Sequence, residues 1–234
     1  MRAAIASAGL AACLLAPISA QALEPQPLIF SAWTDRLEYR AQDGKNGFLW
    51  DGTAWLGKDR NKAWLRTEGE VAGGKVEDAE AQLLWSHAIA PFWDFQTGIR
   101  QDFGTGPDRT HGVIGFEGLA PGWWEVTAAM FVSQKGDVTA RAEAEYDMLI
   151  TQRLILQPRI EINVAMQDIP ALDTGIGLSD YALDLRLRYK ITQEVAPYIG
   201  VSWTRKVGDT ADYARLAGEK PGSLAFVTGV RLQY

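Results

Sequence analysis

The stretch YALDLRLRYK (181–190) alternates apolar and polar residues along its whole length. Successive side chains of an extended chain point to opposite faces. One face of this stretch would carry three leucines between two tyrosines, and the other would carry Asp184, Arg186 and Arg188. The pattern predicts a β-strand with one apolar and one charged face.

The same alternation recurs in stretches whose composition would suit a helix. TARAEAEYD (139–147) is rich in Ala, Glu and Arg, which are good helix formers. Its apolar residues return at every second position, not every third or fourth, so a strand is favoured. LILQPRIEINV (154–164) alternates as well, but it contains Pro158. Proline cannot donate to a strand ladder, so we expect Pro158 at a bulge or near the strand end that faces the short turns.

About twelve such segments follow one another after residue 30, separated by connections of unequal length. The segments are 31–40, 48–57, 61–71, 75–88, 92–103, 110–119, 122–133, 137–149, 154–165, 178–190, 196–206 and 224–234. Every second connection is tight (GKDR, AIAP, LAPG, ITQR and ITQEV), whereas MQDIPALDTGIG and KVGDTADYARLAGEKPGS are longer. Short turns at one end, longer loops at the other and an even strand number are typical of a transmembrane β-barrel. We therefore predict an all-β fold, a transmembrane antiparallel β-barrel over 31–234.

Ionised residues occupy the faces opposite the apolar ones in almost every segment. They are Arg66, Glu68, Glu80, Asp94, Arg100, Glu125, Arg141, Glu143, Glu145, Arg159, Glu161, Asp184, Arg186 and Arg231. A soluble β-sandwich or a lipocalin-like barrel is the alternative, since alternation alone does not separate these folds. We interpret the charges as a network inside a membrane barrel, paired across a narrow lumen because unpaired buried charges are costly. Such a network would plug the lumen, line a narrow path for cations, or do both.

Aromatic residues lie near the ends of several segments, as the interfaces of a membrane barrel require. Examples are Trp55, Trp93, Trp123, Trp124, Tyr189 and Trp203. The chain finishes on LAFVTGVRLQY (224–234), with Tyr234 last. We expect this strand to close the barrel against the first strand and so to leave no free edge. Its apolar face would meet lipid, while Arg231 and Gln233 would face the lumen.

The N-terminal sequence MRAAIASAGLAACLLAPISAQA (1–22) has the features of a cleaved signal peptide, with cleavage after Ala20 or Ala22. Its apolar stretch is too short to span a bilayer comfortably. LAAC (10–13) resembles a lipoprotein box, but the apolar character continues to Ile18, so ordinary cleavage is expected. A short segment, 23–30, would then precede the barrel. Cys13 is the sole cysteine, so the mature chain would have neither disulfides nor thiolate metal sites.

The overall charge limits the partners. The full chain carries a net charge of −6, which argues against binding nucleic acid through basic surfaces. Loss of Arg2 with the signal peptide would leave 22 basic against 29 acidic residues, a net charge of −7. Outer-membrane lipid is the expected partner of the apolar exterior.

Several long blocks resemble the copper resistance protein B family of bacterial outer-membrane proteins. The blocks are LWSHAIAPFWDFQTGIRQDF (84–103), GFEGLAPGWWEVTAAMFV (115–132), AEYDMLITQRLILQPRIEIN (144–163) and VAPYIGVSWTRKVGDTADYARLAGE (195–219), with DRLEYR (35–40) and WLRTEGE (64–70). The resemblance runs from about residue 35 to the last residue. The final strand also resembles the signal by which outer-membrane barrels are recognised by their assembly machinery, through Gly229, Val230, Leu232 and Tyr234.

This resemblance implies a role in copper resistance and copper homeostasis, in which the barrel binds copper ions or passes them across the outer membrane. A general narrow porin or a structural barrel without copper specificity is the alternative. Both termini would be periplasmic, since short turns lie on that side, and a periplasmic copper-handling protein is a possible partner. Family members often carry a segment rich in Met and His ahead of the barrel. Here only about ten residues precede the first strand, LEPQPLIF among them, and they contain neither residue type.

Few side chains of the predicted mature chain suit copper, which prefers imidazole, thioether or thiolate ligands. His87, Met130 and Met148 fall on the predicted lipid-facing side and are interpreted as apolar or interfacial residues. His111 falls on the polar side near the outer end of its strand, with Asp102 and Asp108 nearby, and is the candidate ligand of a weak metal site. Met166, which begins a longer loop, is a further weak candidate.

No catalytic constellation is evident, so we expect no enzymatic activity. Ser86 and His87 are adjacent in the chain and would point to opposite faces of a strand, which prevents a direct Ser–His hydrogen bond. His111 beside a carboxylate is only part of an Asp–His arrangement.

Overall fold

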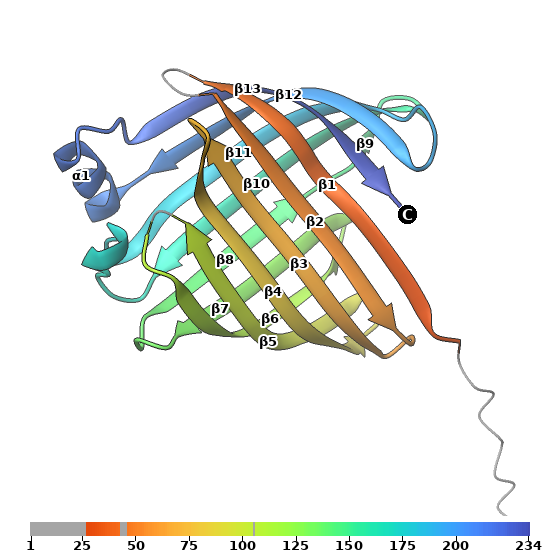
Figure 1. Cartoon of the computed structure of the whole chain (residues 1–234). Helices are drawn as coiled ribbons and strands as arrows, with labels where there is room; N and C mark the ends of the chain where they lie inside the picture. The colour runs from red at the N-terminus through yellow and green to blue at the C-terminus, as the bar shows by residue number, and fades with distance from the viewer. Residues whose placement is uncertain (1–26, 43–45, 105) are drawn as a thin grey trace, which may run out of the picture.

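In the computed structural model, which describes residues 27–42, 46–104 and 106–234, the chain forms a closed antiparallel β-barrel (Figure 1). The strands are β1 (Ile29–Gln42), β2 (Gly47–Gly57), β3 (Asn61–Ala72), β4 (Lys75–Ala90), β5 (Trp93–Gly104), β6 (Arg109–Ala120), β7 (Trp124–Ser133), β8 (Val138–Glu145), β9 (Met148–Leu149), β10 (Leu154–Ala165), β11 (Gly177–Tyr189), β12 (Val195–Lys206) and β13 (Gly222–Gln233). Two short helices, η1 (Pro170–Leu172) and α1 (Gly208–Leu216), lie in the loops. The predicted signal peptide lies outside the described residues.

β8 and β9 are two parts of a single membrane-crossing strand. Arg159 of β10 pairs with Glu145 of β8, and Ile155 of β10 pairs with Leu149 of β9, so the register against β10 is unchanged. The barrel therefore has twelve crossing strands, as predicted.

Pro158 explains the interruption between β8 and β9. It stays in register with Leu185 of β11, so the bulge that we considered there is absent. On the other side, Tyr146 donates its backbone N–H to the Pro158 carbonyl at 3.1 Å. Proline has no N–H to donate in return, and the ladder to the preceding strand breaks at this point. Pro158 does lie near the short-turn end, a few residues from the start of β10.

The first and last strands close the barrel, as predicted. Trp33 of β1 lies opposite Gln233 of β13, and the pairing continues to Gln42 and Ala225. Beyond β13, the backbone N–H of Tyr234 donates to the carbonyl of Ala32 at 2.7 Å. β11 pairs with β10 as well as with β12, which closes the sheet into a ring, and among the described strands only the two-residue β9 has a single partner.

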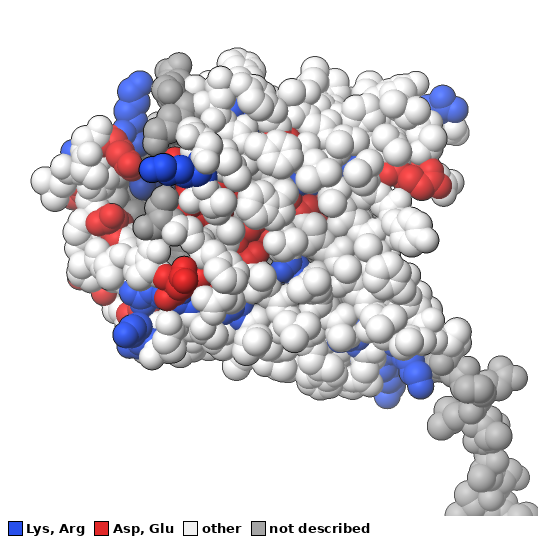
Figure 2. Space-filling view, in the orientation of Figure 1, with Lys and Arg blue, Asp and Glu red and all other residues white. Residues whose placement is uncertain are grey.

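The outer surface is apolar because alternate residues of each strand face outward. Large apolar residues such as Leu83 and Phe226 are 56% and 65% exposed. Soluble monomeric proteins rarely expose large contiguous apolar patches, so this surface is suited to lipid. Figure 2 shows that the face over β1–β4 is predominantly uncharged, with most charged residues at the end that carries α1 and others at the opposite end. The described helices include none long and apolar enough to cross a membrane.

The two ends of the barrel differ. Both ends of the described chain and the short turns lie at one end, and the loops with η1 and α1 lie at the other (Figure 1). One connection at the loop end is nevertheless very short, since Gly73 and Gly74 alone join β3 to β4. Both have positive φ angles (60° and 80°), which a tight two-residue hairpin requires and glycine adopts without strain.

The aromatic belt forms largely as expected, with one correction. Trp123, Trp124 and Tyr189 are exposed on the outside near the short turns. Trp55 was assigned to the same belt, but it lines the interior and stacks on Trp64, with ring centroids 6.4 Å apart. It shares the inward face of β2 with Asp51 and Thr53, so it belongs to the lumen.

Candidate functional site

The lumen contains an aromatic wall and a charge network. The aromatic wall is a cluster of Trp64, Leu84, Val113 and Phe131, against which Trp33 and Trp55 pack. Cations lie over its rings: the Arg66 guanidinium is 5.0 Å from the Trp64 ring centroid, and that of Arg100 is 4.6 Å from Phe131. Such contacts let a charged side chain pack against apolar surface. β3, β4, β6 and β7 therefore contribute apolar residues to the inner face that also carries the charges, and our sequence analysis did not single them out.

The charge network contains buried groups that each have several partners. Arg159 donates to three carboxylates, those of Glu143, Glu161 and Asp184, at 2.5 to 2.9 Å. Glu38 is fully buried and accepts from Arg40 at 2.9 Å, from Arg186 at 3.1 Å and from the Tyr198 hydroxyl at 3.1 Å. Burial of charge is tolerated here because each charge has several partners of opposite sign.

All the predicted network residues lie on the inner wall. One cavity is lined by nine of them: Arg66, Glu68, Glu80, Asp94, Glu125, Arg141, Glu143, Glu145 and Arg231. A second cavity is lined by Arg100. The remaining residues are Arg159, Asp184 and Arg186, which are buried, and Glu161, which pairs with Arg159. The network contains further members that our sequence analysis missed, among them Arg36, Glu38, Arg40, Asp51 and Glu117. Glu38 and Arg40 stand at alternate positions of β1, a signal that was visible in the sequence.

Asp35 and Arg36 could not have been assigned from alternation. The pairing of β1 shifts register after Thr34 on both sides, which marks a β-bulge. The extra residue lets two consecutive side chains face inward, and both line the same cavity. Asp35 there accepts from the Trp33 indole at 2.7 Å and pairs with Arg231 at 3.1 Å.

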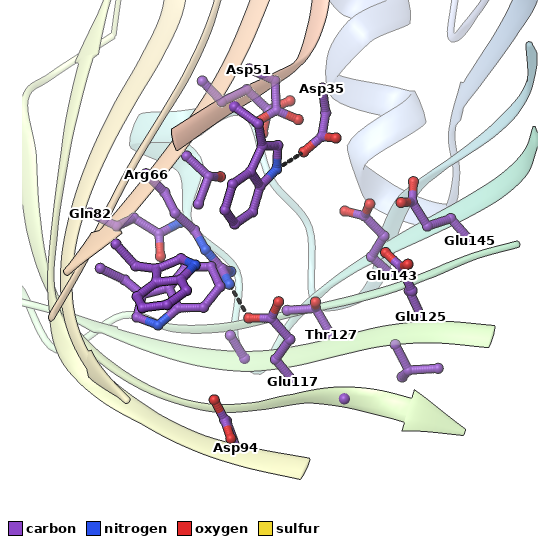
Figure 3. A pocket seen from close by; sticks show the side chains of 18 of the residues that line it. Asp35, Asp51, Arg66, Gln82, Asp94, Glu117, Glu125, Thr127, Glu143 and Glu145 are labelled. Carbon is purple, nitrogen blue, oxygen red and sulfur yellow. Dashed lines mark hydrogen bonds and ion pairs between the residues drawn. The ribbon is translucent and has the colours of Figure 1, made fainter. Parts of the chain in front are cut away.

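The larger cavity, which we call the vestibule, has a volume of about 580 Å3 and is lined by residues of β1 to β8 and β13. It reaches the short-turn end, where Ser31, Phe92 and Gln233 line it. Nine carboxylates and five cationic side chains contribute to its wall. Figure 3 shows Asp35, Glu125, Glu143 and Glu145 projecting into this space, opposite the Arg66–Glu117 ion pair. The excess of carboxylates makes the vestibule attractive to cations.

The smaller cavity, the outer cavity, has a volume of about 150 Å3 and lies at the loop end. Ile169, Leu172 and Thr174 of the loop between β10 and β11 line it on that side. This loop is held by α1, because the Thr210 hydroxyl accepts from the Gly175 backbone N–H at 2.9 Å. The loop 166–176, which α1 holds in place, forms a cap over the outer cavity.

His111 lines the outer cavity and is 5% exposed. Its Nε2 lies 3.0 Å from Oδ2 of Asp102, whose carboxylate also accepts from Arg100 at 2.5 Å. A carboxylate that already accepts from Arg100 accepts from the imidazole as well, so Nε2 is the donor in this contact and Nδ1 is the nitrogen that offers a lone pair. Nδ1 has no hydrogen-bond partner, and neither has the buried Ser179 hydroxyl on the same cavity wall.

The other predicted metal ligands are not brought to His111. Asp108 is exposed in the loop before β6, and Met166 is exposed at the start of the β10–β11 loop; neither lines the outer cavity. Across the described ranges, His, Cys, Asp and Glu side chains do not gather in threes or more in a way that would hold a metal ion. His87 lies on the outside, as expected, where it stacks on Trp85, while Ser86 is buried on the inside. The two residues thus point to opposite faces of β4.

The vestibule and the outer cavity meet at two side chains. Phe131 and Arg141 line both spaces and so stand between them. The lumen is therefore divided into a wide compartment at the short-turn end and a small capped one at the loop end.

These features define a transmembrane β-barrel of the outer-membrane type, and solved structures support this fold. The chain resembles the KdgM porin with a TM-score of 0.54 and 12% identity, covering 88% of this chain and 99% of that one. It resembles the NanC porin with a TM-score of 0.58 and 11% identity, covering 87% and 99%. At such low identity the likeness concerns the fold.

The family is shown by sequence. The family model described as "Copper resistance protein B precursor (CopB)" matches residues 28–234. Copper resistance protein B of Escherichia coli is 43% identical over 217 residues, which cover 93% of this chain and 73% of that protein. A Copper resistance protein B homolog of Pseudomonas syringae pv. tomato is 42% identical over 200 residues, covering 86% and 68%. The chain belongs to the copper resistance protein B family and is an outer-membrane protein of copper resistance.

Proposed function

We propose that the barrel gives copper ions a route across the outer membrane, with a resting place inside its lumen. The vestibule is the observation that carries this proposal. Its wall holds nine carboxylates against five cations, and clefts lined by one sign of charge concentrate ions of the opposite sign. Copper is the cargo that the family implies, and the vestibule is suited to collecting a cation.

The orientation follows from the turns. In bacterial outer-membrane barrels the short turns face the periplasm. The vestibule would then open to the periplasm, both termini would be periplasmic, and the cap would face outward. A periplasmic protein that carries copper would meet the acidic end of the barrel, which makes such a protein the natural partner.

Inside the lumen, His111 is the nitrogen ligand for the cargo. The chain has two histidines, and His87 is on the outer surface. Imidazole with oxygen donors suits divalent copper, whereas the soft monovalent ion prefers thiolate or thioether ligands. The set at the outer cavity, His111 with Asp102 behind it and the Ser179 hydroxyl nearby, therefore favours divalent copper held weakly.

A non-enzymatic role agrees with this picture, and a general narrow porin is the competing function. A porin needs an open lumen, whereas here Phe131 and Arg141 divide it. Swelling of proteoliposomes in sugar solutions separates the two functions, since a sugar-permeable barrel would behave as a general porin.

The deciding experiment compares copper sensitivity and copper accumulation in cells with and without this gene. We expect loss of the gene to change both under copper stress, and the sign of the change in accumulation to give the direction of transport. A complementing copy with the wild-type sequence should restore both. If copper stress reveals no difference although the wild-type barrel is assembled in the outer membrane, the copper function is wrong.

A further inference from the structure

We propose that Arg141 is the gate of the lumen, a side chain whose displacement joins the vestibule to the outer cavity and makes the joined path selective for cations. This inference rests on the proposed passage of a cation through the barrel. It concerns which residue controls that passage, and it follows from four features of Arg141.

The first feature is its position. Arg141 stands on β8 and meets Glu161 of the neighbouring strand β10, but it also meets Glu68 of β3 and Glu80 of β4 on the far wall of the barrel. Its side chain therefore reaches across the lumen. Together with Phe131 it separates the two cavities, and its guanidinium carbon lies 5.9 Å from that ring.

The second feature is that its ion pairs with Glu68 and Glu161 are the longest in the network. Arg141 lies 3.2 and 3.3 Å from Glu80, 3.6 Å from Glu161 and 3.7 Å from Glu68. Arg159 makes its contacts at 2.5 to 2.9 Å. Charge-assisted hydrogen bonds in good geometry are about 2.7–2.9 Å long. Arg141 is thus the more loosely held of the two arginines.

The third feature is that each carboxylate keeps another cation when Arg141 leaves. Glu80 retains Arg100 at 3.0 Å, Glu161 retains Arg159 at 2.5 Å, and Glu68 retains Arg36 at 2.8 Å. Removal of a sole partner would leave a buried charge uncompensated. Because these three carboxylates are shared, Arg141 can move without that penalty.

The fourth feature is the change of charge that movement brings. With Arg141 in place, a fixed guanidinium occupies the narrow point, and a positive charge at a constriction repels cations. With Arg141 aside, oxygens of Glu68, Glu80 and Glu161 face the same point. A cation that competes for these oxygens would both displace the guanidinium and take its place, so the cargo itself opens the gate.

Conductance of the purified full-length barrel in planar bilayers tests this gate in potassium chloride, without copper. R141A and R141Q should conduct several-fold more than the wild type, with a reversal potential that indicates cation selectivity. R66A is the matched control. This substitution also removes one positive charge from the vestibule, but Arg66 does not line the outer cavity. R66A should raise conductance far less than R141A, because the passage between the two cavities stays closed.

Two results would overturn the gate. One is equal conductance of R141A and the wild type, and the other is an increase in R66A as large as in R141A. Failure of both Arg141 variants to fold, seen as loss of the heat-modifiable band in electrophoresis, would also overturn it, since a side chain that moves to open the lumen must be dispensable for folding. F131A then tests the wall independently, and it should raise conductance without increasing cation selectivity.

The gate and the copper function fail separately. If the gene has no effect under copper stress but R141A conducts as expected, the gate stands and the cargo is another cation. If copper tolerance depends on the gene but R141A is as closed as the wild type, copper passage stands and the gate lies elsewhere.

Discussion

At the scale of single residues, charge burial in this barrel depends on sharing. Glu38 has no exposed surface, yet Arg40, Arg186 and Tyr198 all donate to it. Loss of one partner from a buried ion pair typically costs about 3–5 kcal/mol. A carboxylate with three donors keeps most of its stabilisation when one donor moves, and this redundancy is what permits a mobile arginine in the same network.

His111 yields a prediction at this scale. Asp102, held by Arg100, orients the imidazole, as carboxylates commonly do behind metal-ligating histidines. We expect H111Q to lose the nitrogen-coupled signal of bound divalent copper in electron paramagnetic resonance of the detergent-solubilised barrel, purified without a histidine tag. D102N should weaken binding by about 10- to 100-fold.

His87 supplies the control for this measurement. It lies on the outer surface, stacked on Trp85 and 2.9 Å from the Asn61 side chain, so H87Q should bind copper like the wild type. Nδ1 of His111 is closed to solvent, and binding therefore requires a small movement of the ring or of the cap. An unchanged copper titration in H111Q would remove His111 from the proposed route.

At the scale of elements, Pro158 decides the shape of one strand. In a hydrogen-bonded antiparallel pair, each residue donates one N–H to the other. Tyr146 donates to Pro158, but Pro158 has no N–H to return, so β8 and β9 are separate. Within a bilayer an unmade backbone hydrogen bond is more costly than in water, because lipid offers no substitute partner.

We therefore predict that P158V stabilises the barrel and fuses β8 with β9. The new N–H would bond to the Tyr146 carbonyl, and valine suits the apolar exterior beside Leu156 and Ile160. Loss of proline frees the unfolded chain, at a cost of about 0.4–1 kcal/mol, but a hydrogen bond made in lipid should exceed this. The net gain should be on the order of 1 kcal/mol, measured as the free energy of unfolding by urea in lipid vesicles.

P158A separates the hydrogen bond from side-chain packing. Alanine supplies the same N–H without the branched side chain, so it should recover a large part of the gain. Equal or lower stability of both variants would show that the interrupted ladder is already satisfied in another way.

The strands themselves could be predicted from the sequence because each has one lipid face and one lumenal face. Alternation located all twelve, including β8 and β11 with their Ala, Glu, Leu and Arg residues. The bulge at Asp35 could not be predicted, since it depends on the register of both neighbours of β1. The sequence predicted that Pro158 would disturb its strand. Which of the two neighbouring strands loses hydrogen bonds depends on the side to which the missing N–H would have pointed, and this requires the structure.

At the scale of the whole molecule, the lumen was predicted less well than the wall. Period-two alternation puts Trp64 on the face of Arg66 and puts Phe131 on the face of Glu125, but it does not show that these rings from separate strands pack together. Their inward position creates the aromatic wall and leaves space for the vestibule beside it. The meeting of Arg141 with Glu68 and Glu80 likewise requires the closed barrel, because these residues lie on distant strands.

Closure of the barrel supports the last prediction. The Tyr234 backbone exchanges hydrogen bonds with Ala32 at 2.7 and 3.1 Å, while its ring is 91% exposed. The backbone thus completes the β1–β13 seam, and the side chain is free for the membrane interface or the assembly machinery. We predict that Y234A lowers the fraction of heat-modifiable, assembled barrel in outer membranes and that Y234F leaves it unchanged, since the ring and not the hydroxyl is involved.

Refolding of the purified chain into lipid vesicles, without assembly proteins, separates the two roles of the ring. If Y234A refolds like the wild type in vesicles but assembles poorly in cells, Tyr234 acts as a recognition signal for the machinery. If it is impaired in both, the ring contributes to closure by anchoring the last strand at the interface, where aromatic side chains are favoured. Normal assembly of Y234A in cells would contradict both roles and leave the backbone seam with Ala32 as the whole contribution of the last residue.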